Sequence, residues 1–212
     1  MAARQVRVES VNTGVPAPLA GRSGLSGIDK KPREGRVAVG SLGLAGDHVV
    51  DTVNHGGLDQ AVYLYCVEDY DWWKAELGAD LWPGAFGENL TVSGIVTADV
   101  SVGDRFRCGD LLLEASAARI PCETLSAHMG DRLFVRRFFR ANRTGFYCRV
   151  IESGDVGAGD VLDCIPFAGA RVPITELVET WGLMGLDGET VARFRAAPVH
   201  REIIEKLAAR YG

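Results

Sequence analysis

Alternating apolar and polar residues open the chain and predict a first β-strand at residues 6–11, VRVESV. The pattern becomes strongly β again after residue 100. Segments 105–108 and 111–115 flank Gly109-Asp110, and a two-residue connection of this kind is typical of a β-hairpin. The chain is therefore predicted to be mainly β.

A short repeat indicates how the strands are arranged. The pattern Asp-Val-X-X-Gly-Asp occurs at residues 99–104 and again at residues 155–160, each time just before a predicted strand. Two matching turn-and-strand units suggest equivalent positions in one closed sheet, so we expect a β-barrel.

Helical patterns flank these strands. Segment 68–77 predicts a helix that ends at Gly78, and segment 131–142 predicts a second helix with apolar residues on one side. We therefore expect a mainly β protein with a few helices beside the barrel.

The composition changes after the last predicted strand, at residues 161–165. Pro166 cannot donate to a sheet ladder, and a linker rich in Pro, Gly and Ala follows it. We expect a β-barrel domain at residues 1–165 and a small three-helix domain at residues 166–212. Its predicted helices are 175–180, 189–195 and 199–210.

Composition and charge narrow the function classes. Hydrophobic residues at 47% and charged ones at 24% are ordinary for a globular protein. A net charge of -5 argues against a protein that coats nucleic acid or an anionic membrane. No apolar run approaches the roughly 20 residues that span a bilayer, and the N-terminus lacks the apolar segment of a signal peptide. We therefore expect a cytoplasmic protein.

The five cysteines are widely spaced and form no CxxC pair, so we expect reduced thiols without a disulfide framework or a structural zinc site. Cys122 stands out because Pro121 fixes its own φ and pushes Ile120 into an extended conformation. We expect this thiol at the stiff end of the strand that starts at Leu111. A lone cysteine is also often a small buried hydrophobe, so its position alone does not mark a site.

A long loop at residues 13–27 is rich in Gly, Pro and Ser, and a loop of this length usually binds something or is disordered. Its end brings Ser26 close in sequence to Lys30 and Lys31. A hydroxyl and two ammonium groups beside a flexible glycine suit an anion-binding edge, and they suit an ordinary solvated loop equally well.

Polar residues and glycines are dense between residues 42 and 60. For Asp47 and Asp51 we favour a role as turn caps, whereas His55 is either satisfied internally or a proton carrier. Further along, Glu88 and Asn89 place an acceptor next to an amide in a glycine-flanked loop, where either suits a turn cap.

The helix predicted at residues 131–142 carries Arg132, Arg136 and Arg140 in a row, four residues apart. Such a row is either a solvated face or an edge that recognises phosphate.

Four motifs occur in a characteristic order: Leu44-Ala-Gly-Asp47, His55-Gly-Gly-Leu-Asp-Gln-Ala-Val62, Gly84-Ala-Phe-Gly-Glu-Asn-Leu90 and Arg119-Ile-Pro-Cys122. In order and spacing they resemble the motifs of MOSC domains, the C-terminal domains of molybdenum cofactor sulfurases. The closest match is the stand-alone YiiM-like branch, and the helical tail resembles the three-α domain that follows the MOSC domain there.

The resemblance implies a MOSC-type β-barrel that binds the molybdenum cofactor, a molybdopterin. In this family the cysteine after proline is proposed to ligate molybdenum or to carry sulfur, and that position is Cys122. A thiolate is a soft metal ligand, and Arg119 nearby would lower the pKa of the thiol. Ile120 departs from the family, which often has another polar residue there.

Other motif positions extend the expected site. His55 and Asn89 fall on pocket motifs, with His55 as the catalytic candidate for steering a proton. Ser26, with Lys30 or Lys31, falls on the family's basic loop and is expected to help hold the cofactor's phosphate, with the Arg132 row as a further candidate.

The YiiM-like branch is associated with the reduction of N-hydroxylated purines such as 6-hydroxylaminopurine, which implies a small N-hydroxylated substrate. The sequence has no dinucleotide fingerprint and no iron–sulfur cysteine spacing, so a separate flavin or iron–sulfur electron donor is expected. Two alternatives remain: a carrier of cofactor or sulfur without turnover, and a metal-free Cys122 persulfide. The sequence leaves a homodimer open.

Overall fold

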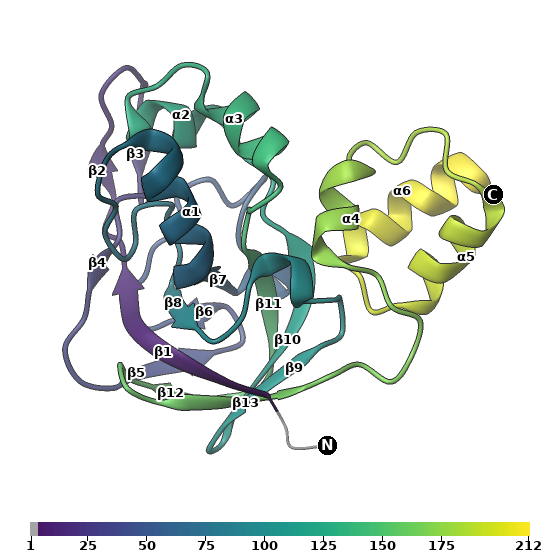
Figure 1. The fold of residues 1–212 in the computed structure, drawn as a ribbon, viewed down its shortest axis with the longest axis horizontal. Coiled ribbons are helices and arrows are strands. Elements are labelled where there is room, and N and C mark those ends of the chain that lie inside the picture. Colours follow the sequence, from purple (N-terminus) through teal and green to yellow (C-terminus); the bar gives the residue numbers. More distant parts are fainter. Residues whose placement is uncertain (1–3) are drawn as a thin grey trace.

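The computed structural model describes residues 4–212, so the first three residues of the predicted barrel domain lie outside the described part. Its main strands are β1 (Arg4–Thr13), β7 (Val62–Cys66), β8 (Leu90–Ser93), β9 (Arg105–Cys108), β10 (Leu111–Ala118), β11 (Phe146–Glu152) and β13 (Val161–Ile165). Within residues 4–212 these seven strands form a barrel in the order β13-β9-β10-β11-β7-β8-β1, which closes because β1 also pairs with β13 (Figure 1).

Shorter strands decorate the barrel. Strand β4 (Lys31–Pro32) extends the sheet beyond β1. A separate three-stranded sheet and a two-stranded ladder complete the β-structure of residues 4–212. They contain β5 (Val37–Gly40), β6 (Gly43–Leu44) and β12 (Gly154–Val156), and β2 (Ala17–Pro18) with β3 (Leu25–Ser26), respectively.

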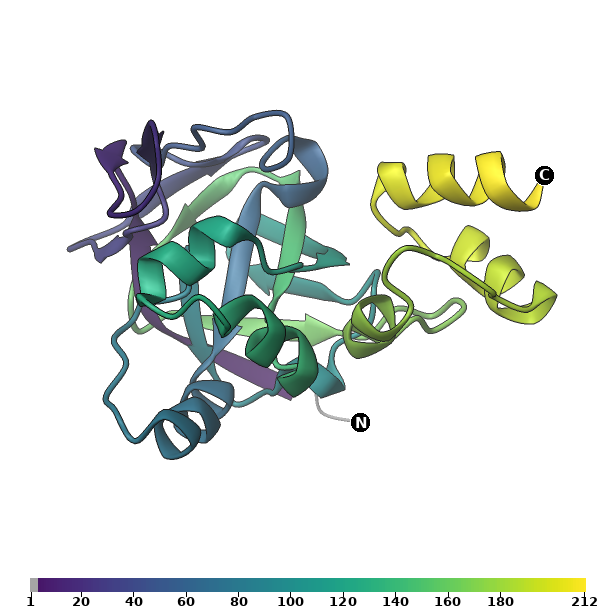
Figure 2. The same cartoon turned by 90° about the horizontal axis from the view of Figure 1, so that it is seen from above.

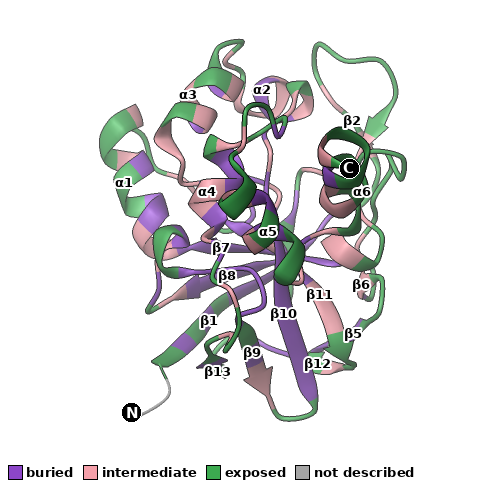
Figure 3. Ribbon diagram, turned by 90° about the vertical axis from the view of Figure 1, so that its right-hand side faces the viewer, coloured by how far each residue is buried: buried purple, intermediate pink, exposed green. Residues whose placement is uncertain are grey.

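Strand β10 crosses the middle of the molecule, and all 8 of its residues are buried (Figure 3). Leu111 pairs with Cys108 across the hairpin predicted from Gly109-Asp110. On its other edge β10 pairs with β11, and the register shifts between Ala115 and Ala117, which marks a β-bulge just before the strand ends.

The repeated turn has a structural counterpart. The Asp104 carboxylate accepts a hydrogen bond from Ser101 N at 2.8 Å, and the Asp160 carboxylate accepts one from Gly157 N at 2.9 Å. Each aspartate therefore closes the same kind of turn, just before β9 in one case and just before β13 in the other. These two strands are paired neighbours in the barrel, so the repeat marks equivalent positions as predicted.

Strand β7 separates two cores because its side chains alternate between its faces. Val62, Leu64 and Cys66 belong to the main cluster of buried apolar residues. Tyr63 and Tyr65 belong to a second, aromatic cluster.

The aromatic cluster packs under α1 (Val67–Leu77), α2 (Glu123–Met129) and α3 (Phe134–Ala141). Trp73 and Phe138 stack with their ring centroids 5.5 Å apart, and Phe86 lies edge-on to Phe138 at 5.1 Å. Helix α1 ends at Gly78, whose left-handed conformation forms the expected C-cap. Helix α2 has no counterpart among the helices predicted from the sequence.

The C-terminal helices α4 (Ile174–Glu179), α5 (Gly188–Ala196) and α6 (Arg201–Tyr211) gather beside the barrel (Figures 1 and 2). Leu177, Phe194 and Leu207 belong to the same buried cluster as the barrel interior. The predicted fold class, a MOSC-type barrel with flanking helices and a C-terminal three-helix unit, is confirmed. The domain boundary between residues 165 and 166 stays a prediction. No helix among residues 4–212 has the length and apolarity needed to cross a membrane.

Replacing Phe138 with alanine should lower the free energy of unfolding by about 3–5 kcal/mol, because this fully buried ring joins α3 to the aromatic cluster. Urea denaturation followed by circular dichroism measures the change. Leu133→Ala is the matched control, because Leu133 is 58% exposed just before the same helix and should change stability by under about 0.5 kcal/mol. An equal loss of unfolding free energy in the two variants would contradict the role of Phe138 in joining α3 to the aromatic cluster.

Candidate functional site

A cavity of about 300 Å³ that is lined by both polar and apolar side chains, here called the inner cavity, opens beside the barrel. Segments far apart in the sequence line it, from the loop near residue 19 to Tyr147 on β11. Six of the seven predicted site residues are among its lining: Ser26, Lys30, His55, Asn89, Arg119 and Cys122.

Asp47 ties the wall of this cavity together. One carboxylate oxygen accepts a hydrogen bond from Gly14 N at 2.8 Å, and the other accepts one from the Asn89 side chain at 2.8 Å. The Lys30 ammonium contacts both oxygens. Asp47 therefore joins three segments, which is a larger role than the turn cap favoured from the sequence.

Glycines allow these segments to approach so closely. A Cβ on Gly14 would lie 2.1 Å from the carbonyl oxygen of Gly27, and a Cβ on Gly27 would lie 2.1 Å from that of His48. Both distances are far inside van der Waals contact, so side chains at these two positions would push the loops apart.

Lys30 is buried, and its ammonium is already paired with Asp47. Burial lowers the pKa of the Lys30 ammonium, and the Asp47 charge opposes that shift. Lys31 does not line the cavity: it is exposed, pairs with Asp29 at 2.7 Å and lies over the Trp82 ring. Neither lysine therefore offers an unpaired charge to an anion in the cavity.

Asn89 supports the wall through its amide. Its Oδ1 accepts a hydrogen bond from Tyr63 N at 3.0 Å, and its nitrogen donates to Asp47. The neighbouring Glu88 is fully buried and accepts from Gly84 N and from the Tyr70 hydroxyl at 2.6 and 2.8 Å. Glu88 thus caps the glycine-flanked turn, a role that the sequence suggested for either Glu88 or Asn89.

Cys122 lies elsewhere than expected. Strand β10 ends at Ala118, four residues earlier, and Cys122 immediately precedes α2 in an extended backbone conformation. The expected strand-end placement is therefore wrong, because the chain leaves the sheet before Pro121. The result is a half-buried thiol that lines the cavity.

Burial disfavours the Cys122 thiolate most strongly, but three groups outweigh it. A hydrogen bond from His55, the positive charge of Arg119 and the backbone N–H of Leu125 together lower the pKa of the Cys122 thiol to about 6. The buried thiols of Cys66 and Cys148 have no such surroundings, and burial raises their pKa well above the ordinary value.

The charge beside the thiol comes from a buried side chain. Arg119 is 4% exposed, donates to its neighbour's carbonyl, Ile120 O, at 3.2 Å, and lies 5.8 Å from the centre of the Phe138 ring. A guanidinium held this way keeps its charge near Cys122 without a carboxylate to neutralise it among these contacts.

His55 sits in a short turn that ends beside Cys122. Asp51 accepts hydrogen bonds from the backbone N–H groups of Val53 and Asn54, both at 3.2 Å, and His55 N donates to Asp51 O at 3.1 Å. The Asn54 side-chain amide also donates to Asp51, at 3.0 Å, and this bond is the main reason why the pKa of the Asp51 carboxyl is lowered, with the backbone bonds from Asn54 and Val53 adding to it. Asp51 is therefore the turn cap that the sequence indicated, and the turn places the imidazole in the cavity.

Three residues that were not predicted from the sequence also line the inner cavity: Arg22, His48 and Tyr147. Arg22 is an exposed cation in the long loop. Its position ahead of Lys30 and Lys31 is the sequence feature that could have marked it as a site residue. The Arg132 row lies elsewhere. Arg136 and Arg140 line a separate groove that shares no residue with the inner cavity, which favours the solvated-face interpretation.

Comparison with known proteins defines the class. The MOSC domain model matches residues 51–163, more than half of the chain, so the chain belongs to the MOSC domain family, which is associated with the molybdenum cofactor. His55, Asn89, Arg119 and Cys122 fall inside the matched region.

Within this family the chain is a YiiM-like protein. It is 38% identical to the uncharacterized protein YflK of Bacillus subtilis over 160 residues, 74% of this chain and 72% of that one. It is 34% identical to YiiM of Escherichia coli over 143 residues, 66% and 64% of the two chains. The crystal structure of YiiM from Geobacillus stearothermophilus superposes with a TM-score of 0.81 at 25% identity, covering 98% of this chain and 100% of that one.

A further relative is a protein named Reductase from Gibberella moniliformis. It is 33% identical over 144 residues, which span 66% of this chain but only 26% of that protein.

Asp47→Asn should lower the free energy of unfolding by about 3–5 kcal/mol, because it leaves the buried Lys30 ammonium without its counter-charge. Chemical denaturation measures the loss. Asp29→Asn removes the same charge from the exposed pair with Lys31 and should cost less than about 1 kcal/mol. A small, equal effect of both substitutions would show that Asp47 does not hold the wall.

Alkylation of Cys122 by iodoacetamide should follow a pH profile with its midpoint at about 6, because only the thiolate reacts. In the folded protein the pKa of the Cys122 thiol lies below its ordinary value of 9.0, so the thiolate stabilises the folded state. This stabilisation is lost as pH falls through about 6. His55→Gln should move the midpoint upward. Cys108→Ala is the control and should leave it unchanged, because the pKa of the Cys108 thiol is raised by burial. A midpoint near the ordinary value in the wild-type protein would contradict this electrostatic assignment.

Proposed function

We propose that the chain binds the molybdenum cofactor in the inner cavity, with the Cys122 thiolate as a metal ligand, and that it reduces N-hydroxylated bases. The observation that best supports this proposal is the Cys122 thiol in the lining of this cavity, whose pKa of about 6 makes it largely ionised at neutral pH. A thiolate is a soft ligand that suits molybdenum. The residues present therefore fit this group.

The cavity also offers charge for the cofactor's phosphate. Arg22 is an exposed cation at the cavity, and the Ser26 hydroxyl lies in the same lining. We assign phosphate binding to these two residues, since the Lys30 charge is neutralised by Asp47. Lys30 and Asn89 then act as supports of the wall, and Lys31 takes no part.

When bound, the cofactor supplies the redox chemistry in which two electrons and two protons convert N–OH into N–H and water. His55 holds a proton beside the thiol and can deliver it to the departing oxygen, since an imidazole exchanges protons near neutral pH. Arg119 keeps the metal-binding sulfur ionised. The electrons come from a separate flavin or iron–sulfur protein, and the relative named Reductase supports a redox setting.

A second candidate is a carrier that holds sulfur on Cys122 as a persulfide. The same low pKa favours it, because an ionised thiol is also a nucleophile. The two candidates differ in what they leave on the purified protein: molybdenum in the first, and a sulfur adduct on metal-free protein in the second.

Protein purified from a host that makes the cofactor should contain molybdenum, and Cys122→Ala should lose most of it, as measured by mass spectrometry of the metal. Cys108→Ala is the control, because it removes another partly exposed thiol. This variant should retain the wild-type molybdenum content. Unchanged molybdenum in Cys122→Ala would refute this ligand assignment.

Turnover is tested on the same preparations with 6-hydroxylaminopurine and a chemically reduced dye as electron source, with adenine as the measured product. Molybdenum-loaded wild-type protein should form adenine, and Cys122→Ala should not. Metal-loaded protein that forms no adenine would support a carrier without turnover.

A further inference from the structure

A second cavity, here called the outer cavity, lies between the barrel and the three-helix unit and has a volume of about 600 Å³. Its size is within the range typical of small-molecule sites. Seven residues line both cavities, and Arg22, His55, Cys122 and Tyr147 are among them. The Cys122 thiol and the His55 imidazole therefore stand where the two cavities meet, so that a group in either cavity reaches the same two side chains.

The helical wall of the outer cavity is mainly apolar. Leu177 and Leu183 contribute buried side chains, Ile203 a partly buried one, and Trp181 a ring that is 53% exposed. Lys206 lies over this ring, 5.4 Å from its centre. A half-exposed tryptophan in the lining offers a large flat surface to a bound ring.

The barrel-side wall mixes apolar and polar side chains. Ala117, Ala118 and Ile120 are apolar, whereas Asp51 and Asn54 add polar groups from the turn that carries His55. Carboxylate and amide oxygens accept hydrogen bonds from the ring N–H and exocyclic N–H groups of a heterocycle. A half-exposed tryptophan in the same cavity as carboxylate and amide acceptors is a combination that suits a flat, hydrogen-bonding base.

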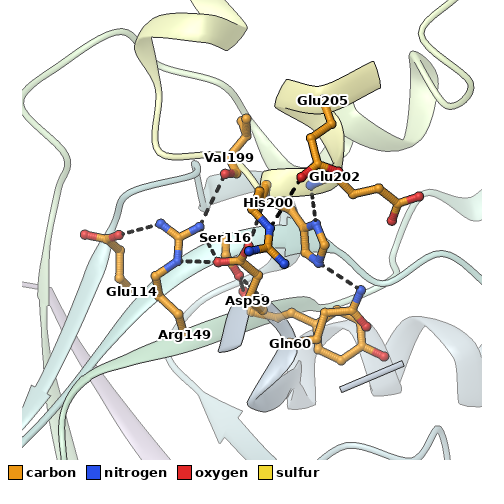
Figure 4. Close-up of polar contacts among 11 residues, drawn as sticks. Asp59, Gln60, Glu114, Ser116, Arg149, Val199, His200, Glu202 and Glu205 are labelled. Atoms are coloured by element: carbon orange, nitrogen blue, oxygen red, sulfur yellow. Dashed lines mark hydrogen bonds and ion pairs between the residues drawn. The ribbon is translucent and has the colours of Figure 1, made fainter. Parts of the chain in front are cut away.

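The helical wall is fastened to the element that follows His55, the short 3-10 helix η1 (Leu58–Gln60) (Figure 4). Arg149 donates to the Asp59 carboxylate at 2.8 Å and to Val199 O at 3.3 Å. His200 N, just before α6, donates to Ser116 O on β10 at 2.9 Å. These bonds fix the start of α6 relative to the barrel, so the outer cavity is a built feature of the fold.

His200 adds a specific contact to Gln60. Its Nδ1 accepts from Glu202 N at 3.1 Å, and burial lowers the pKa of its imidazole, so the neutral ring carries its hydrogen on Nε2. That nitrogen lies 3.3 Å from the Gln60 amide. The buried Oε1 of Gln60 otherwise has no partner, so the amide is assigned with Oε1 accepting from His200. The three-helix unit thereby fixes a side chain that lines both cavities.

From this geometry we infer that the outer cavity is the substrate chamber and that the three-helix unit builds it, with Trp181 as the surface against which a flat heteroaromatic base packs. The inference rests on the proposed function, because it places the N-hydroxylated base in the outer cavity and the cofactor in the inner one. The N–OH group of a base in this chamber points toward the junction at Cys122 and His55.

The test measures binding of 6-hydroxylaminopurine to cofactor-loaded protein by equilibrium dialysis, with no electron donor present, and then KM and kcat with the donor added. Trp181→Ala should weaken binding and raise KM by about ten-fold, while kcat and molybdenum content stay near their wild-type values. Trp181→Phe keeps an aromatic surface and should restore most of the affinity. Trp82→Ala is the matched control, because Trp82 is 45% exposed and lines neither cavity.

The outcomes separate this inference from the proposed function. Wild-type protein that binds the purine through Trp181 but forms no adenine would support the chamber and refute the reductase. Protein that forms adenine with the same binding and KM in Trp181→Ala and Trp82→Ala would overturn the chamber and leave the reductase standing. Absence of purine binding to the loaded wild-type protein would also overturn the chamber.

Discussion

The buried contact between Asp47 and Lys30 is the interaction on which the inner cavity depends. One carboxylate holds an ammonium, an asparagine amide and the backbone N–H of Gly14, and so joins three segments that the sequence keeps far apart. A buried charge is tolerated only with such partners, since an unpaired one is costly. The contacts of Asp47 therefore shape the cavity wall. They explain why Lys30, in the basic loop, stabilises the fold instead of binding an anion.

The sulfur chemistry depends on a balance of opposing effects. Burial alone would keep the Cys122 thiol neutral, as it does for Cys66 on β7. His55 and Arg119 reverse that tendency by a hydrogen bond and a nearby charge. The site thus combines partial shielding from water with an ionised sulfur, and each of these properties suits a metal ligand as well as a reactive thiol.

Much of the fold could be predicted because it is encoded locally. Alternating residues marked β1, the Gly109-Asp110 turn marked the β9–β10 hairpin, and two copies of one turn motif marked neighbouring barrel strands. The site was harder to predict, because its residues meet only in three dimensions. Local pattern could not show that Lys30 is neutralised by Asp47, and the short helix α2 after Pro121 has too few residues for a clear helical period. The order of the family motifs supplied Cys122 and His55 where periodicity could not.

Closure of the barrel has a consequence for how the protein matures. The last barrel strand, β13, pairs with the first, β1, so Val6 meets Leu162 only after nearly the whole barrel sequence has been synthesised. Contacts between such distant segments form late, because closing a long loop costs chain entropy before it gains contacts. Barrel closure therefore waits for β13, and the outer cavity waits longer still, because Lys206 in its lining lies in α6. A group that contacts both cavities needs segments from most of the described chain to be in place.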